Sequence, residues 1–168
     1  MKPIREFPGQ ELQWTRVKRW KRAFELHSGD EVLAMLYPQK GANSMIAEAA
    51  DGHWAIKRRS FWNADIVITE LTSQAEIAVV RRGRNRRLTF SDGRLFTLTT
   101  SSFWRNEWVW LNDEGTPLIR YQRGKSLLIE PTANSLSELS LLVIVGWRLL
   151  VLQQEEDTAS AAATVAWM

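Results

Sequence analysis

The sequence contains no cysteine, so disulfide bonds and metal sites built on thiolates are excluded. Histidine is scarce as well. His27 and His53 are the two in the chain, and two distant histidines without cysteine do not make a metal site. We therefore expect no bound metal and no cofactor. The first ten residues, MKPIREFPGQ, lack the apolar stretch of a signal peptide. These features favour a cytoplasmic protein, with a peripheral position at a membrane as the alternative.

The signatures of common catalytic sites are missing too. The chain has no G-x-S-x-G nucleophile elbow, no Walker A loop and no G-x-G-x-x-G turn. Its nineteen acidic residues single out no pair placed for general acid–base catalysis. We therefore expect no catalytic residues and predict that the protein is not an enzyme. An enzyme with an unrecognised site in the mouth of the fold stays as an alternative.

The chain does have the composition of one globular domain with many indole rings. Its 168 residues are 45% apolar, and nine of them are tryptophan. Large aromatic rings bury much area each, so we expect a tryptophan-rich core. The net charge of +3 is mildly basic and does not by itself indicate a nucleic-acid partner. We expect a monomer and no nucleic acid among its partners.

From residue 12 to about residue 130, apolar and polar side chains alternate with a period of two. Phe24 and Leu26, for example, alternate with polar neighbours, and Asp51-Gly52 is a strong hairpin signal between two such runs. About eleven or twelve short strands at this spacing are typical of barrels and sandwiches. The pattern predicts an all-β fold.

Parts of the two halves of the strand region match each other at a constant offset of 63 residues along the chain. Three features fall in this single register: Val32 and Leu33 on Leu95 and Phe96, Gly52 on Gly115, and Ile66 on Ile129. A duplicated half and the chance recurrence of turns each explain the match.

One long apolar run closes the strand region, from Leu139 to Leu152, interrupted by Ser140, Gly146 and Arg148. A helix that is apolar on every face must be enclosed by protein or by lipid. The run is shorter than the roughly 20 residues of a membrane-spanning helix, and a central arginine is costly in lipid. We predict a core helix; a membrane anchor over residues 136–152 is the alternative.

The limits of this helix follow from capping signals. Ser135 and Glu138 have the spacing of a capping box, which predicts a helix over residues 135–154. We expect a barrel domain over residues 12–155, a flexible leader over 1–11 and a disordered tail over 156–168.

Together these elements predict an all-β domain with one central helix: a closed, mostly antiparallel barrel of about 12 strands around the C-terminal helix. Such a barrel is too wide to be filled by its own side chains, and the helix would fill it. Gly146 should permit close approach of a strand. Arg148 should lie near an end of the barrel or pair with an inward carboxylate such as Glu48, Glu70 or Glu107.

The order of the pieces resembles the tubby C-terminal-like superfamily, which includes the LURP-one-related proteins and the phospholipid scramblases. The matching segments are F-E-L-x-S-G-D-E-V-L-A at 24–34, I-A-E-A-A-D-G-H-W-A-I-K-R at 46–58, S-D-G-R-L-F-T-L at 91–98, W-V-W-L-N-D-E-G-T-P-L at 108–118 and the closing helix at 136–152. The resemblance covers roughly residues 12–154 and rests on order, not on a signature motif.

This resemblance implies a twelve-stranded barrel around a hydrophobic C-terminal helix and a function without catalysis. Members of the superfamily include phosphoinositide-binding modules and proposed scramblases. No catalytic residue carries over to this chain. A calcium segment of the scramblase type has no convincing equivalent, because the acids at 155–157 lack the alternating ligands of a calcium loop.

The sharpest local feature is an arginine-rich turn between two strands, with a second basic group upstream. Guanidinium groups present a planar fork that suits phosphate, so these residues are candidates for binding a lipid headgroup or another phosphate-bearing ligand. The alternatives are a contact with the backbone of a nucleic acid and a solvated loop that only aids solubility. The candidate residues are Arg81, Arg82, Arg84, Arg86, Arg87, Lys57, Arg58 and Arg59.

Two aromatic pairs, Phe61-Trp62 and Phe103-Trp104, lie at strand ends beside basic residues. These pairs either pack in the core or at the rim of the fold, or form a surface that faces a ligand or a membrane.

The sequence as a whole predicts a non-enzymatic binding or scaffolding module. A membrane-attached, scramblase-like protein is the alternative, and the sequence indicates no particular protein partner.

Overall fold

The computed structural model describes residues 1–167 except 41–42, 61, 103–106 and 123–124. Within these residues the chain forms twelve strands, two short 3-10 turns and one long helix. The strands are β1 (Leu12–Arg16), β2 (Phe24–Ser28), β3 (Glu31–Pro38), β4 (Ser44–Ala49), β5 (Gly52–Arg58), β6 (Ile66–Glu70), β7 (Ala75–Arg81), β8 (Arg86–Phe90), β9 (Leu95–Ser102), β10 (Glu107–Leu111), β11 (Pro117–Tyr121) and β12 (Ser126–Ile129).

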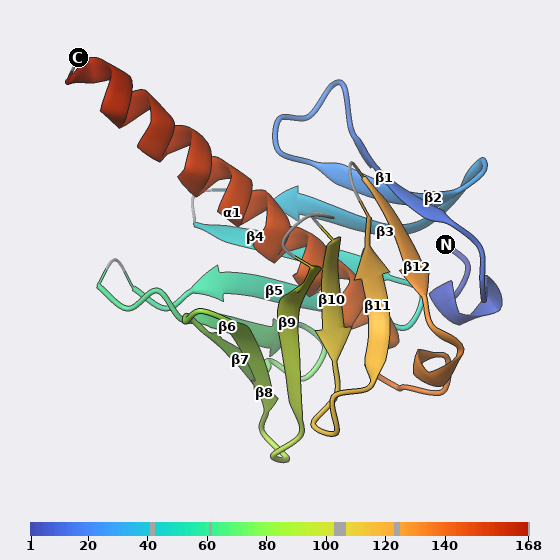
Figure 1. The fold of residues 1–168 in the computed structure, drawn as a ribbon. Helices are drawn as coiled ribbons and strands as arrows, with labels where there is room; N and C mark the ends of the chain where they lie inside the picture. Colours follow the sequence, from blue (N-terminus) through green and yellow to red (C-terminus); the bar gives the residue numbers. More distant parts are fainter. Residues whose placement is uncertain (41–42, 61, 103–106, 123–124, 168) are drawn as a thin grey trace.

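The strands form one closed barrel (Figure 1). Each strand pairs with the strands before and after it in sequence, and β1 pairs with β12 to close the ring. All of these pairs are antiparallel. Closure gives every one of these strands a partner on both sides, which removes the edges that could recruit another chain. The predicted architecture, a closed barrel of twelve strands with a central C-terminal helix, is confirmed.

Helix α1 (Leu139–Ala166) passes through the barrel and leaves it at one end (Figure 1). Every residue from Leu139 to Trp147 is buried, and so is Leu149. The strands supply the apolar surroundings that this all-round apolar segment needs. The apolar run is therefore a core helix enclosed by protein. Within the described residues, neither α1 nor the short turns reach the length and hydropathy of a membrane-spanning helix.

Tryptophan rings fill much of the space between helix and strands. Trp14 of β1 stacks on Trp147 of α1 with ring centroids 5.5 Å apart and an interplanar angle of 7°. Phe24 meets Trp147 edge-on at 5.6 Å. Trp14 and Trp110 are completely buried. These contacts confirm the expected tryptophan-rich core and tie the first strands to the last helix.

Gly146 lets two barrel side chains reach the backbone of α1. The Trp110 Nε1–H donates a hydrogen bond to the Leu142 carbonyl oxygen at 2.9 Å. The Tyr121 hydroxyl lies 2.8 Å from the Val143 carbonyl oxygen and 3.1 Å from that of Leu142. A Cβ at position 146 would collide with both rings. The predicted close approach at Gly146 is confirmed, and it fixes the axial position of the helix.

The two tyrosines should titrate far above the ordinary tyrosine pKa. Burial, then a 2.6 Å hydrogen bond to Glu48, raises the pKa of Tyr37 to about 12. Complete burial raises the pKa of Tyr121 further. Because folding favours the neutral phenols, this stabilisation is complete below about pH 10, the unfolded pKa, and is lost as pH rises through the folded values. We expect tyrosinate absorbance to appear near pH 12 for Tyr37, and for Tyr121 only on unfolding.

The control for this titration is Tyr37→Phe, which should remove the step near pH 12 and leave the Tyr121 signal tied to unfolding. In concentrated urea both phenols should ionise at about pH 10. A tyrosine that titrates near pH 10 in the folded protein would contradict the burial described above.

The strand positions agree in part with the internal repeat. The shift that carries Val32 onto Leu95 also carries the start of β1 at Leu12 onto the start of β7 at Ala75, and the start of β4 at Ser44 onto that of β10 at Glu107. The other strands of the second half begin close to the positions that the same shift gives. Two of the six strand pairs thus keep the offset unchanged, whereas Ile66 begins β6 and its match Ile129 ends β12. A duplicated half and the chance recurrence of turns each stay an explanation of the match.

The helix begins and ends later than the sequence predicts. It starts at Leu139, and the expected capping box does not form, because Glu138 instead accepts hydrogen bonds from Ser137 and Arg94. Burial would raise the pKa of Glu138, but these bonds hold it below its ordinary value. The other end reaches Ala166, not residue 154.

The segment predicted to be a disordered tail over 156–168 is thus helical as far as Ala166, and residues 157–167 are exposed. Five of the eight residues from 159 to 166 are alanine, the strongest helix former. The buried half of α1 also provides a formed helix on which further turns can grow without a new nucleation step. Composition and attachment together favour the helix over a coil.

The predicted flexible leader is held against the barrel by a buried side chain and by ion pairs. Ile4, in the 3-10 turn Ile4–Glu6, is buried in the core, and this turn contacts α1. Lys2 pairs with Glu31 at 2.8 Å. The apolar Ile4 side chain gives residues 1–11 a fixed place that a polar leader would lack.

Candidate anion-binding site

A pocket of about 270 Å³ opens at the end of the barrel from which α1 leaves. It is lined by residues at the ends of β3, β4, β5, β6 and β8, by residues of the β1–β2 and β7–β8 turns, and by the middle of α1. Five arginines and two glutamates line it, together with several apolar residues. The charged residues are Arg22, Arg58, Arg82, Arg86, Arg148, Glu155 and Glu156; Met45, Ile56, Ile66 and Leu152 are among the apolar ones.

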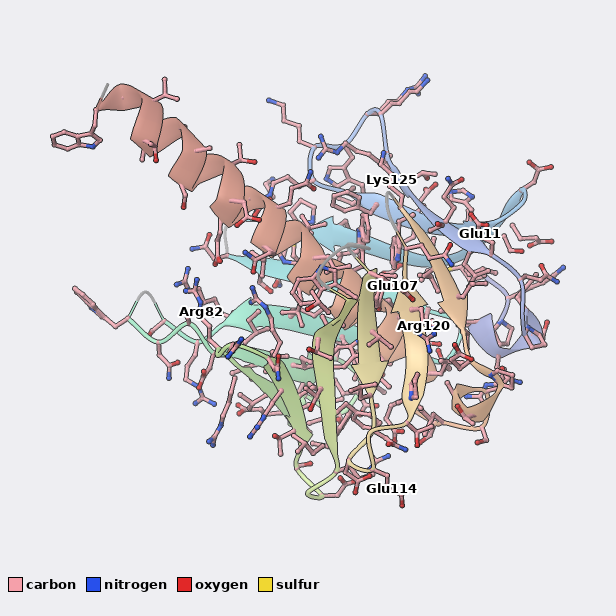
Figure 2. The ribbon with its side chains drawn as sticks, in the orientation of Figure 1. Glu11, Arg82, Glu107, Glu114, Arg120 and Lys125 are labelled. Carbon is pink, nitrogen blue, oxygen red and sulfur yellow. The ribbon has the colours of Figure 1, made fainter. Side chains whose placement is uncertain are left out.

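Three of the predicted arginines line this pocket, and the strand period places two of them there. Arg58 follows the buried Ile56 by two residues in β5, so both side chains lie on the inner face of the barrel. Arg86 precedes the buried Leu88 by the same spacing in β8. Arg82 comes from the turn between β7 and β8, and Figure 2 labels it near the end where the helix leaves.

Five of the eight predicted site residues lie outside the pocket: Lys57, Arg59, Arg81, Arg84 and Arg87. Arg81 and Arg87 are cross-strand partners on β7 and β8, and both are exposed on the outer face. Arg59 forms an ion pair with Glu76 at 3.2 Å. The arginine-rich turn is therefore split by the strand period into an inner set and an outer set.

Two arginines that the sequence did not assign to a site complete the pocket. Arg22 lies in the β1–β2 turn and has a φ of 65°, an unfavourable backbone conformation for a residue with a Cβ. Its guanidinium lies 3.3 and 3.4 Å from the two carboxylate oxygens of Glu155. Arg148 comes from α1, two turns before Glu155 and Glu156. A charged residue within an otherwise apolar run is the sequence signal that could have identified Arg148 as a site residue.

Arg148 lies near an end of the barrel, one of the two predicted positions, but it pairs with none of the three predicted carboxylates. Glu107 pairs with Arg120 at 3.4 Å on the barrel wall (Figure 2). Glu48 accepts from the Tyr37 hydroxyl, and Glu70 accepts from Ser73 at 2.5 Å. Among the residues that the structure describes, no hydrogen bond or ion pair of Arg148 is found.

Two guanidinium groups of the pocket are only partly compensated. Burial lowers the pKa of Arg148; the Glu155 carboxylate opposes this shift, and the nearby Arg22 adds to it. Burial also lowers the pKa of Arg86, with Glu156 opposing and Arg82 adding. Arg86 bonds to a neutral partner, the Gln153 Oε1 at 2.7 Å. Both groups would gain from a further negative charge in the pocket.

A buried hydroxyl on the pocket wall is also left without a partner. Ser44 is only 4% exposed, lies at the start of β4 and lines the pocket. Its Oγ makes no hydrogen bond with any residue that the structure describes. Buried hydroxyls normally find partners, so this atom is available as a hydrogen-bond donor to a ligand oxygen.

The chemistry of the pocket follows from its charges. Five guanidinium groups face two carboxylates, which leaves three positive charges around one small opening. The pocket is at the lower end of the ~300–1,000 Å³ typical of small-ligand sites. Multiple N–H donors, a free hydroxyl and excess positive charge together are suited to a small oxyanion such as phosphate.

The other sequence candidates contribute little. Trp62 is 92% exposed, so its ring is not packed into the core, while Phe61, Phe103 and Trp104 lie outside the described residues. His27 is hydrogen-bonded to Glu25. No group of three possible metal ligands occurs among the described residues.

No family model matches the chain, and neither a curated protein nor a solved structure gives a match. The site is therefore interpreted from its own residues.

Proposed function

We propose that this protein is a non-enzymatic binding module whose arginine-lined pocket binds a phosphate-bearing anion. One observation carries the proposal: the partly buried Arg148 guanidinium has no ionic partner among the described residues and lines an opening with four further arginines. A charge that is removed from water without a partner lowers the stability of the folded protein. A bound phosphate would supply the missing counter-charge.

The free Ser44 hydroxyl and the strained Arg22 backbone support the same proposal. The barrel does not need an unpartnered buried hydroxyl or a positive φ at an arginine. Such unfavourable local features are most often found at functional sites. The donors come from strand turns on one side and from α1 on the other, so an anion between them would contact both. This arrangement favours a defined pocket over a merely solvated basic loop.

We also propose that the chain is related to the tubby-like superfamily. A closed twelve-stranded barrel around a C-terminal helix supports it. That superfamily includes lipid-headgroup binders, so the phosphate could belong to a lipid or to a free metabolite. A cytoplasmic or membrane-peripheral location would suit either ligand.

The test compares inner with outer arginines. In chloride buffers without sulfate, Arg58→Gln with Arg86→Gln should weaken binding of inorganic phosphate and glycerol 3-phosphate at least about 100-fold. The estimate follows because each charge-assisted hydrogen bond contributes about 1.5–3 kcal/mol. The matched control, Arg81→Gln with Arg87→Gln, removes equal charge from the outer face and should change affinity less than about threefold. Isothermal titration calorimetry measures both.

A second arm identifies the source of the phosphate. Flotation with phosphatidylcholine vesicles, with and without phosphatidic acid, reports lipid binding, whereas calorimetry reports free phosphate esters. Vesicle binding lost in the inner variant and kept in the outer one would assign a lipid headgroup. Equal losses in the two variants, or no phosphate binding by the native protein, would overturn the proposed site.

A further inference from the structure

The second half of α1 carries two carboxylates into the pocket. Glu155 pairs with Arg22 at 3.3 Å, and Glu156 pairs with Arg82 at 2.9 Å. All four side chains are about half exposed, between 40% and 55%. Ion pairs this exposed contribute little to stability, so stability alone does not explain why acids stand in an arginine pocket.

These ion pairs divide the five arginines of the pocket into two sets. Arg22 and Arg82 each already have a carboxylate partner. Arg58, Arg86 and Arg148 make no ion pair with any described residue. Ser44, with its free hydroxyl, lines the same pocket. The protein itself therefore pairs two of these arginines with acids and leaves the other three without an ion pair.

We infer that Glu155 and Glu156 are specificity-determining residues that restrict the pocket to ligands with a single phosphate group. The inference rests on the proposed function. One phosphate would take the three guanidinium groups that have no ion pair. A second phosphate would have to use Arg22 and Arg82, where it meets two carboxylates or must separate them from these arginines. Like charges placed side by side exclude a wrong ligand more effectively than a missing contact does.

The apolar residues of the pocket agree with a small organic phosphate. Met45, Ile56, Ile66 and Leu152 line the pocket together with the arginines. An inorganic ion would leave this apolar surface uncovered, whereas the carbon skeleton of a phosphomonoester would cover it. Phenyl phosphate should accordingly bind more tightly than inorganic phosphate.

The experiment changes the charge of the two acids without changing their shape. The double variant Glu155→Gln with Glu156→Gln is titrated with inositol 1-phosphate and inositol 1,4,5-trisphosphate. We expect the native protein to prefer the monophosphate. The variant should gain at least about tenfold in affinity for the trisphosphate and less than about threefold for the monophosphate. Thermal unfolding should change little, because both ion pairs are exposed.

Asp113→Asn with Glu114→Gln is the matched control, since these two neighbouring acids are exposed in the β10–β11 turn and do not line the pocket. This variant also removes two negative charges, so it corrects for the general effect of removing them. If the native protein prefers the trisphosphate, or if the double variant gains equally for both ligands, the specificity role is wrong while the pocket stands. If neither protein binds either ligand, the proposed function falls, and this inference falls with it.

Discussion

Gly146→Ala is expected to destabilise the protein by about 3 kcal/mol or more, because overpacking of a core costs about 1–3 kcal/mol and displaced rings would leave buried donors unpaired at about 1–3 kcal/mol more. The added Cβ would stand 2.5 Å from the Trp110 Nε1 and closer still to the Tyr121 hydroxyl. Alanine favours a helix over glycine by only about 1 kcal/mol, so the collision decides the sign. Urea unfolding followed by tryptophan fluorescence measures the change.

Gly83→Ala is the control for this substitution. Gly83 lies in the exposed β7–β8 turn, where a Cβ would meet its nearest neighbour, the Asn85 carbonyl oxygen, at an ordinary 3.4 Å. The same chemical change should therefore leave the unfolding midpoint almost unchanged there. A Gly146→Ala protein as stable as Gly83→Ala would show that helix and strands are not in contact at this point.

The fold could be predicted because both the strands and the central helix leave a clear pattern in the sequence. Alternation as far as Ile129 gives the strands, and the all-round apolar run gives a helix that must be enclosed. Closure follows from the number of strands together with the need to surround that helix. The offset between the two halves, seen first in three matches, recurs unchanged in the starts of two of the six pairs of strands and to within three residues in the other four.

The site was predicted only in part, because its arginines come from separate connections and a helix. Counting charges along the chain selected Arg81 and Arg87 together with Arg82 and Arg86. Applying the strand period to the same stretch would have separated the inner from the outer residues. Arg22 gave no local signal, because its role depends on the approach of Glu155 from a distant part of the sequence.

The helix limits could not be predicted for a similar reason. Ser135 and Glu138 have the right spacing for a cap, but Glu138 contacts Arg94, which is distant in the sequence. At the other end, the macrodipole disfavours acids such as those at 155–157 near a helix C-terminus, which predicts that the helix ends before them. In the structure the alanine-rich segment continues the helix to Ala166, so these acids lie inside it, where that penalty does not apply.

Replacing the unpaired charge of Arg148 should make the protein more stable and less able to bind. Arg148→Met keeps an unbranched side chain and the helix propensity but removes the guanidinium. Because Arg148 has no ionic partner among the described residues and burial lowers its pKa, its removal should raise the free energy of unfolding by about 1–2 kcal/mol. The same change should weaken binding of glycerol 3-phosphate at least about tenfold, since one charge-assisted hydrogen bond is lost.

Arg58→Met separates these two effects. Arg58 lines the same pocket and also lacks an ion pair among the described residues, but its side chain is exposed, so water already solvates its charge. Its loss should weaken phosphate binding without stabilising the fold. Opposite changes in stability and affinity for Arg148→Met, with a change in affinity alone for Arg58→Met, would show that the fold maintains a partly buried cation for the ligand. If Arg148→Met is less stable than the native protein and binds phosphate equally well, Arg148 is a structural residue, and the pocket has lost the group on which its function was argued.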